Sequence, residues 1–297
     1  MQLSMVHIVT LILSVAFALW LSINAGRKVK SAEDFGVAGR SAGVSMLVGS
    51  ILGTIVGGAA TVGTTQMAYN AGFVGCWFTL GSLVGLWIMG LGYAARLRSV
   101  KLSTVPEFLA FNFGRQAGPV ASLVACAGVF FSVVTSMITA INLFVFLFKL
   151  PVLPAMLIAG VASLLLVYFG GIGGSGLAGL FKMLLIFVAI FTAGGKAFWD
   201  LGLVSGLTAQ LPASYLSLHI TDNLMNLGGM VVGIIVTQTY VQILFSGKSD
   251  RTAMLACLIA GLICVPVGLA AALVGMFMKV AHPGIVPIHA LPMYLLA

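Results

Sequence analysis

Eight apolar segments, each long enough to cross the roughly 30 Å hydrocarbon core of a bilayer, constrain this chain more than any other feature. Only 7% of the residues are charged and 61% are hydrophobic, whereas soluble domains have about 25% charged residues. A chain with so little polar surface cannot face water on all sides. We therefore predict an all-α polytopic membrane protein with a lipid bilayer around it. The predicted spans are 5–24, 42–69, 73–95, 118–147, 151–170, 176–199, 224–246 and 252–280.

The net charge of +8 would suit a nucleic-acid partner, but its distribution along the chain indicates membrane topology instead. Ten basic residues lie in the connections that follow the first, third and seventh spans, all on one side of the membrane. Because cytoplasmic loops are enriched in Lys and Arg, we expect the N-terminus outside, in the plasma (inner) membrane, and no nucleic-acid partner. The ten are Arg27, Lys28, Lys30, Arg40, Arg96, Arg98, Lys101, Arg115, Lys248 and Arg251.

The second span, GSILGTIVGGAATVGTTQ over residues 49–66, is rich in glycine, which weakens helices. Gly49, Gly53 and Gly57 recur every four residues, a small-xxx-small ridge that lets another helix approach closely. The ridge does not account for the adjacent Gly58, where the helix could open. Opened carbonyls cost several kcal/mol each in lipid unless protein, water or an ion satisfies them, so they can form a cation site. Close packing and a broken, site-forming helix both remain open interpretations.

The seventh span, LMNLGGMVVGIIVTQTYVQILF, is a second glycine-interrupted helix. Its glycines are Gly228, Gly229 and Gly233, followed by the polar Thr237, Gln238 and Gln242. If each interrupted span opens a five-helix unit, the two units start on opposite sides of the membrane, because five is odd. That arrangement is an inverted repeat, which places a binding site near the midplane between the interrupted helices.

We accordingly predict one transmembrane domain over residues 1–297, built from two inverted five-helix repeats and an extra N-terminal helix. The extra helix is 5–24 and the first repeat is 42–199. The second repeat begins at 224–297 and stops three helices short, so we expect a chain truncated after about eight transmembrane helices.

A short amphipathic helix is predicted within residues 101–114, KLSTVPEFLAFNFG, between the third and fourth spans. Thr104 and Glu107 are spaced for a capping box, and Pro106 is tolerated in a first turn. Gly114 suits the position just after a helix end. We interpret this helix as a connection at the inner membrane surface.

Four stretches of the sequence together resemble the sodium:solute symporter family, which includes proline, sialic acid and sugar symporters. They are EDFGVAGRS at 33–41, GTTQMAYNAG at 63–72, LSTVPEFLAFNFG at 102–114 and TQTYVQILFSGKSDRTA at 237–253. The resemblance implies the neurotransmitter:sodium symporter-type fold of two inverted repeats. It also implies sodium-coupled uptake of a small organic solute by alternating access, with sodium as the coupling ion and no other cofactor.

The resemblance also implies where the site residues lie. In relatives, main-chain carbonyls of the broken first core helix hold sodium, and these positions correspond to Gly53 and Val56. Substrate contacts correspond to residues of the two broken helices, and polar side chains near the breaks would line the path. The implied substrate contacts are Gly57, Gly58, Ala60, Met230 and Gly233; the implied polar lining is Thr61, Thr237, Gln238 and Gln242.

Two residues depart from the family pattern. Ile55 stands where the proline symporter has an acidic residue, which favours an anionic or neutral solute. Lys182 stands where many relatives have Asp or Gln near the sodium route. Three interpretations of Lys182 stay open: it snorkels to the inner interface, it replaces sodium or shuttles a proton, or it pairs with a residue beyond this segment.

No phosphate-binding loop, nucleophile–base pair, carboxylate pair or His cluster with metal-ligand spacing occurs in the sequence, so we predict neither an enzyme nor a metal site other than sodium. The alternative to sodium-coupled transport is a solute-sensing module of a signalling protein. A proton-coupled or sodium-independent transporter that uses Lys182 is a further alternative.

Overall fold

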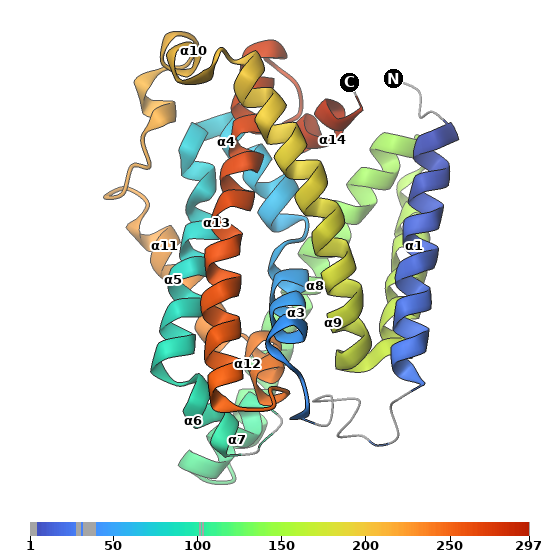
Figure 1. Ribbon diagram of the computed structural model, residues 1–297, viewed down its shortest axis with the longest axis vertical. Coiled ribbons are helices and arrows are strands. Elements are labelled where there is room, and N and C mark those ends of the chain that lie inside the picture. Colours follow the sequence, from blue (N-terminus) through green and yellow to red (C-terminus); the bar gives the residue numbers. More distant parts are fainter. Residues whose placement is uncertain (1–4, 28–30, 32–39, 101, 103, 297) are drawn as a thin grey trace.

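The computed structural model describes residues 5–27, 31, 40–100, 102 and 104–296 (Figure 1). The described chain is a bundle of helices joined by short turns. The longer helices are α1 (Met5–Gly26), α3 (Val44–Ile55), α5 (Trp77–Gly92), α8 (Ala117–Phe148), α9 (Val152–Asp200), α11 (Leu224–Val236) and α13 (Asp250–Ala281). The shorter ones are η2 (Ala59–Gly63), α4 (Thr64–Ala71), η3 (Gly72–Cys76), α6 (Ala94–Ser99), α7 (Val105–Phe113), α10 (Leu203–Gln210), η4 (Ala213–Leu216), α12 (Gln238–Phe245), η5 (Pro287–His289) and α14 (Ala290–Leu295).

Each predicted span coincides with helical chain, but the number of spans stays a prediction. By length and hydropathy, four helices in the described residues are long enough to cross a membrane, and a fifth is added if α11 and α12 form one bent span. Two predicted spans fall within α9, whose apolar parts are Val152–Leu165 and Gly176–Asp200. Figure 1 shows α9 turning back on itself between these two parts.

The glycines of α3 allow its backbone to touch α9. A Cβ atom at Gly53 would lie 2.7 Å from the Cα of Gly179, and one at Gly179 would lie 2.7 Å from the carbonyl oxygen of Gly49. Such contacts leave no room for any side chain, so the predicted packing ridge is confirmed for Gly49 and Gly53. Gly57 does not belong to it, because a Cβ there would meet nothing closer than the Thr54 oxygen at 4.0 Å.

Helix α13 forms the centre of the bundle and packs against α3, α4, α5 and α9. Its buried face consists mainly of Ala, Gly, Cys and Val, whose small side chains permit close approach. Thr65 of α4 donates a hydrogen bond from its buried hydroxyl to the Ala271 oxygen, at 3.0 Å. At Gly72 the chain reverses between α4 and α5 with a φ of +64°, and a Cβ there would collide with the Tyr215 oxygen. Glycine is required at this turn.

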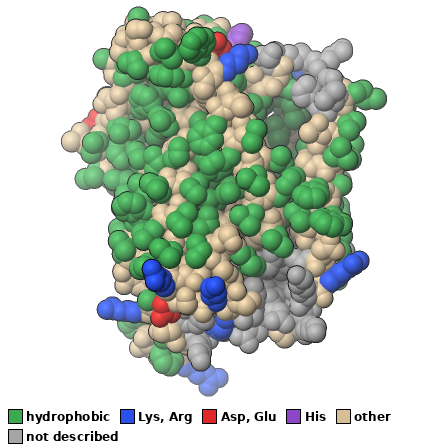
Figure 2. Space-filling view, in the orientation of Figure 1, with side chains coloured by type: hydrophobic (Ala, Val, Ile, Leu, Met, Phe, Trp, Pro, Cys, Tyr) green, Lys and Arg blue, Asp and Glu red, His purple; other side chains and the backbone are tan. Residues whose placement is uncertain are grey.

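The outer surface is apolar around its middle and basic at one end. Figure 2 shows hydrophobic side chains over most of the visible face and Lys and Arg gathered at the end where α6, α7 and α12 lie in Figure 1. None of the α8 residues is buried, although the helix is strongly apolar, as expected for a helix in contact with lipid. The basic end agrees with the predicted loops; Lys28, Lys30 and Lys101 lie outside the described residues.

The predicted short helix with its capping box is present as α7. The Thr104 hydroxyl accepts the Glu107 amide at 3.2 Å, and the Glu107 carboxylate accepts the Thr104 amide at 3.2 Å. Gly114 ends the helix with a φ of +93°. The first amide of α7, on Val105, donates to the side-chain oxygen of Gln238 at 2.7 Å, which ties α7 to the start of α12.

Replacing Gly179 tests the glycine contact between α3 and α9. We expect Gly179→Leu to lower the free energy of unfolding by about 1–3 kcal/mol, because overpacking forces the two backbones apart. The matched control is Gly195→Leu on the same helix, where a Cβ meets nothing within 4 Å. Unfolding of the purified protein by sodium dodecyl sulfate measures both. Equal stability of the two variants would show that α3 and α9 are not in backbone contact.

Candidate functional site

The second predicted span is broken at the doubled glycine. Helix α3 ends at Ile55, and Val56 leaves the helical region with φ −81° and ψ 73°. The Gly57 amide then donates to the Ile55 oxygen at 2.9 Å instead of the oxygen four residues back. Beyond the break, η2 is a π-helix in which the Gly63 amide donates to Gly58 at 2.8 Å. The interpretation of 49–66 as a helix that opens is confirmed.

Two carbonyl groups at the break have side-chain partners. The Gly57 oxygen accepts the Thr61 amide at 3.2 Å and the Thr61 hydroxyl at 2.8 Å. The Gly53 oxygen accepts a hydrogen bond from the Nζ atom of Lys182. Because unsatisfied backbone groups are costly in a bilayer, these bonds stabilise the open segment. Lys182 therefore contacts the end of α3 while its side chain remains partly exposed, and its role stays a prediction.

Close packing explains how Lys182 reaches the break. Gly179 contacts α3 at Gly53, and Lys182 follows three residues later on the same face of α9. The side chain of Lys182 lines two cavities, each of about 350 Å³. We name the first the lysine cavity; its wall includes Gly57, Gly58, Thr61, Thr139, Asn142 and His289. We name the second the α1 cavity; its wall includes Ser14, Ser22, Gly53 and Gly179.

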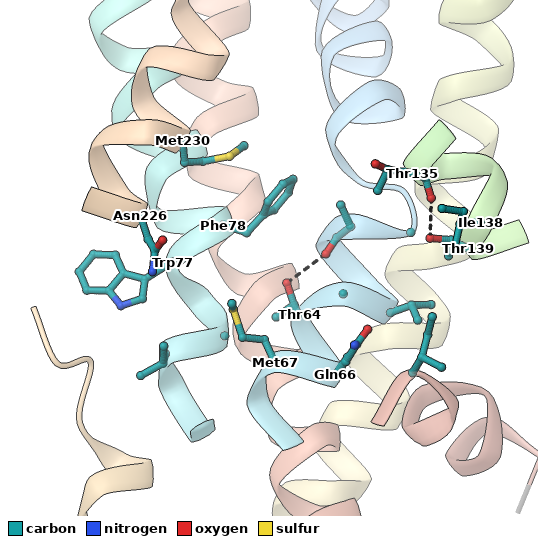
Figure 3. Close-up of a pocket in the computed structure, with 17 residues that line it drawn as sticks. Thr64, Gln66, Met67, Trp77, Phe78, Thr135, Ile138, Thr139, Asn226 and Met230 are labelled. Atoms are coloured by element: carbon teal, nitrogen blue, oxygen red, sulfur yellow. Dashed lines mark hydrogen bonds between the residues drawn. The ribbon is translucent and has the colours of Figure 1, made fainter. Parts of the chain in front are cut away.

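A larger cavity of about 470 Å³ adjoins the lysine cavity, with which it shares Gly58, Val62, Thr139 and Ile288. Figure 3 shows its lining, contributed by the opened segment and α4, by the start of α5, by α8 and by α11. Aromatic and thioether side chains of Trp77, Phe78, Met67 and Met230 form one side. Hydroxyl and amide groups of Thr64, Gln66, Thr135, Thr139 and Asn226 supply polar atoms.

The α8 face of these cavities was not anticipated from the sequence. Thr135, Ser136, Thr139 and Asn142 all line one or both cavities. Each donates to a carbonyl four residues back at 2.9–3.1 Å, which leaves its acceptor oxygen available to a ligand. The spacing of three and four residues places them on one side of the predicted span 118–147. This polar stripe in an apolar helix was the signal that could have identified them.

The structure brings some of the implied site residues together and places others elsewhere. Gly57, Gly58 and Thr61 line the lysine cavity, Gly58 and Met230 line the large cavity, and Gly53 lines the α1 cavity. Val56 and Ala60 are fully buried next to the break. Gly233, Thr237, Gln238 and Gln242 lie at or beside the break between α11 and α12. The roles of all these residues stay predictions.

The seventh predicted span is interrupted at Thr237 and not at its glycines. Gly228, Gly229 and Gly233 lie within regular helix α11, which corrects the expected position of the break. Helices α11 and α12 meet at 41°, and Thr237 between them is extended, with φ −69° and ψ 123°. Its amide and hydroxyl both donate to the Gly233 oxygen. A β-branched residue favours this extended conformation, whereas glycine alone does not require a break.

A backbone bridge joins the two interrupted segments. The Ala42 amide donates to Ser246, and the Lys248 amide donates to Ala42, both at 3.0 Å. These bonds connect the start of α3 with the end of α12. Both interrupted segments are thus held together at the basic end of the molecule (Figure 1).

Positive charge dominates the site. In the described part of the chain, the residues that line these three cavities include no Asp or Glu; the ionisable ones are Lys182 and His289. His289 stacks on Phe146 with centroids 4.5 Å apart, and Lys149 lies over the same ring at 5.4 Å. Burial, and secondly the charge of Lys149, hold the pKa of His289 below its usual range. The described residues contain no cluster of three or more His, Cys, Asp and Glu for a metal ion.

Removing the charge of Lys149 tests this electrostatic relation. We expect Lys149→Met to raise the pKa of His289 toward its ordinary value, because a nearby positive charge disfavours the protonated ring. NMR titration of protein with labelled histidines measures the pKa, and His289→Gln assigns the signal among the four histidines. Lys248→Met, at the far end of the bundle, is the control. An unchanged or lower pKa in Lys149→Met would contradict the assignment.

Two comparisons with known proteins agree with this architecture. The sequence model of the sodium:solute symporter family matches residues 35–292. A solved structure of a Na⁺-coupled sialic acid symporter, in a substrate-bound outward-open state, superposes on this chain with a TM-score of 0.81 at 15% identity. The match covers 98% of this chain and 66% of that symporter, so the chain spans just under two thirds of its length. At this identity the likeness shows a common fold.

Proposed function

Since the chain belongs to the sodium:solute symporter family, we propose that it forms part of a secondary active transporter that moves a small organic solute together with a cation. The proposed mechanism is alternating access around a fixed site at the broken helix. The symporter compared above has a bound substrate and couples to Na⁺, which makes sodium the family's expected ion. We further propose an inverted repeat, with 42–199 as the first unit, and an N-terminus outside the plasma membrane.

The observation that supports the proposal most directly is the position of the break. The opened segment between α3 and α4 forms a wall shared by the large cavity and the lysine cavity. Irregular backbone is tolerated in a membrane where it lines a cavity or is buried in protein. Broken helices at the midplane are the sites at which transporters bind substrates and ions. The break and the two cavities together fit that arrangement.

The cavities limit the class of solute. A volume of about 470 Å³ suits a small molecule, and its mixed lining supplies an apolar side and hydroxyl and amide partners. An ammonium group on the solute would have no carboxylate partner among the described lining residues, and it would meet Lys182. We therefore propose a neutral or anionic organic solute.

Filling the shared wall tests this proposal. A Cβ at Gly58 would lie 2.7 Å from the Cγ2 of Thr139, so Gly58→Leu obstructs both cavities. We expect this variant of the intact protein to lose solute uptake by about tenfold or more, the effect of about 1.4 kcal/mol of lost binding. Vesicles loaded with the purified protein and a panel of labelled small organic acids and neutral solutes measure uptake.

The matched control is Gly195→Leu, because a side chain there meets nothing within 4 Å and Gly195 lines none of these cavities. Gly195→Leu should transport at the wild-type rate. Wild-type uptake by a folded Gly58→Leu variant would place the solute site somewhere else.

A further inference from the structure

We propose that the ammonium group of Lys182 takes the place of a coupling cation at the Gly53 carbonyl, so that this site is coupled to a proton bound by Lys182. The inference rests on the proposed function, because it concerns the ion at the same broken helix. It departs from the sodium coupling that is typical of the family.

The first argument is the bond itself. Residue Gly53 is one of two positions whose carbonyls the family resemblance assigns to sodium, and its oxygen already accepts a hydrogen bond from Lys182. An ammonium group has the single positive charge of sodium and up to three N–H donors for carbonyl oxygens. A sodium ion at the same oxygen would stand next to this charge, and the two like charges would repel each other. Lys182 and sodium therefore compete for Gly53.

The second argument is that packing fixes the lysine in place. The contact between Gly53 and Gly179 brings α9 against α3 without intervening side chains. Lys182 lies one turn beyond Gly179. Its Nζ atom thus reaches the end of α3 because of backbone contacts that no larger residue would permit. A larger residue at Gly53 or Gly179 would move α3 and α9 apart and leave the Gly53 oxygen without its lysine partner.

The third argument is the absence of an acidic partner in the described surroundings of Lys182. No Asp or Glu lines the lysine cavity or the α1 cavity, α3 has no ionisable residue, and α1 has none beyond His7, whose side chain lies outside the described part. From the C-terminal segment, His289 faces the lysine cavity; the polar groups that α8 contributes to that wall are hydroxyls and one amide, and none of them is ionisable. The Gly53 carbonyl dipole holds the ammonium without a fixed counter-charge, which permits the lysine to exchange its proton.

The α1 cavity places two serine hydroxyls in the same cavity as Lys182. It is lined by Ser14 and Ser22 of α1 together with Lys182. The Ser22 hydroxyl is buried and has no hydrogen-bond partner in the described structure, so it can bind water there. In the proposed step, the neutral amine takes one proton from a hydronium ion, which leaves as water, and becomes the ammonium that donates to Gly53. Release of that proton leaves the amine neutral and weakens its hold on the opened segment.

Two measurements together test the inference: the binding of sodium, and the ion gradient that drives accumulation of the solute. Purified intact protein is equilibrated with radioactive sodium at neutral pH, with excess unlabelled choline or sodium as competitors. The samples are the wild type, Lys182→Met, and Lys196→Met, a control on α9 that removes an exposed lysine away from both cavities. Vesicles with the same proteins receive either a sodium gradient or a pH gradient, and accumulation of the labelled solute panel is followed.

We expect the wild type and Lys196→Met to retain no sodium above the choline background, and to accumulate solute with the pH gradient alone. Lys182→Met should lose proton-driven accumulation but still exchange solute across the vesicle membrane when no gradient is present. Stoichiometric sodium retention by the wild type, or proton-driven accumulation by Lys182→Met equal to that of the wild type, would overturn the inference. If no solute exchanges in any sample, the proposed transport function fails, whereas sodium retention still decides the role of Lys182.

Discussion

The rest of the structure depends on the hydrogen bonds made by the backbone carbonyl groups at the break, from Gly53 to Gly57. In a bilayer each unpaired carbonyl costs several kcal/mol, so an open helix persists only where other groups replace the lost bonds. Here the hydroxyl of Thr61 bonds Gly57, and the ammonium of Lys182 bonds Gly53. The same two residues line the lysine cavity. Stabilisation of the break and formation of the candidate site are therefore one arrangement.

That arrangement in turn requires close contact between helices. Gly53 and Gly179 permit α3 and α9 to meet backbone to backbone, and this contact sets the reach of Lys182. Small residues are the usual means of close approach in membranes, where no hydrophobic force drives helices together. The backbone hydrogen bonds of Ala42 with Ser246 and with Lys248 hold the second interrupted segment against the first. The candidate site thus lies between helices that are closely packed near one end.

Several of these features could be predicted from the sequence, because they follow from local chemistry. The apolar helical segments, the capped helix α7, the glycine contact at Gly49 and Gly53 and the break at Gly57 and Gly58 were predicted and are present. The break at Thr237 was misplaced onto glycines, since glycine permits a break without requiring one. The hydrogen-bond partner of Lys182 and the position of Thr139 in the cavity wall depend on which helices are neighbours. The periodicity within one helix does not specify its neighbours.

The most direct test of the account is a structure of the intact protein with a solute that it transports, solved by electron cryo-microscopy in a lipid nanodisc. The account predicts density for the solute between the opened segment and α8, in contact with Gly58 and Thr139. Solute density in another part of the protein, with an unbroken helix through Gly57 and Gly58, would contradict it.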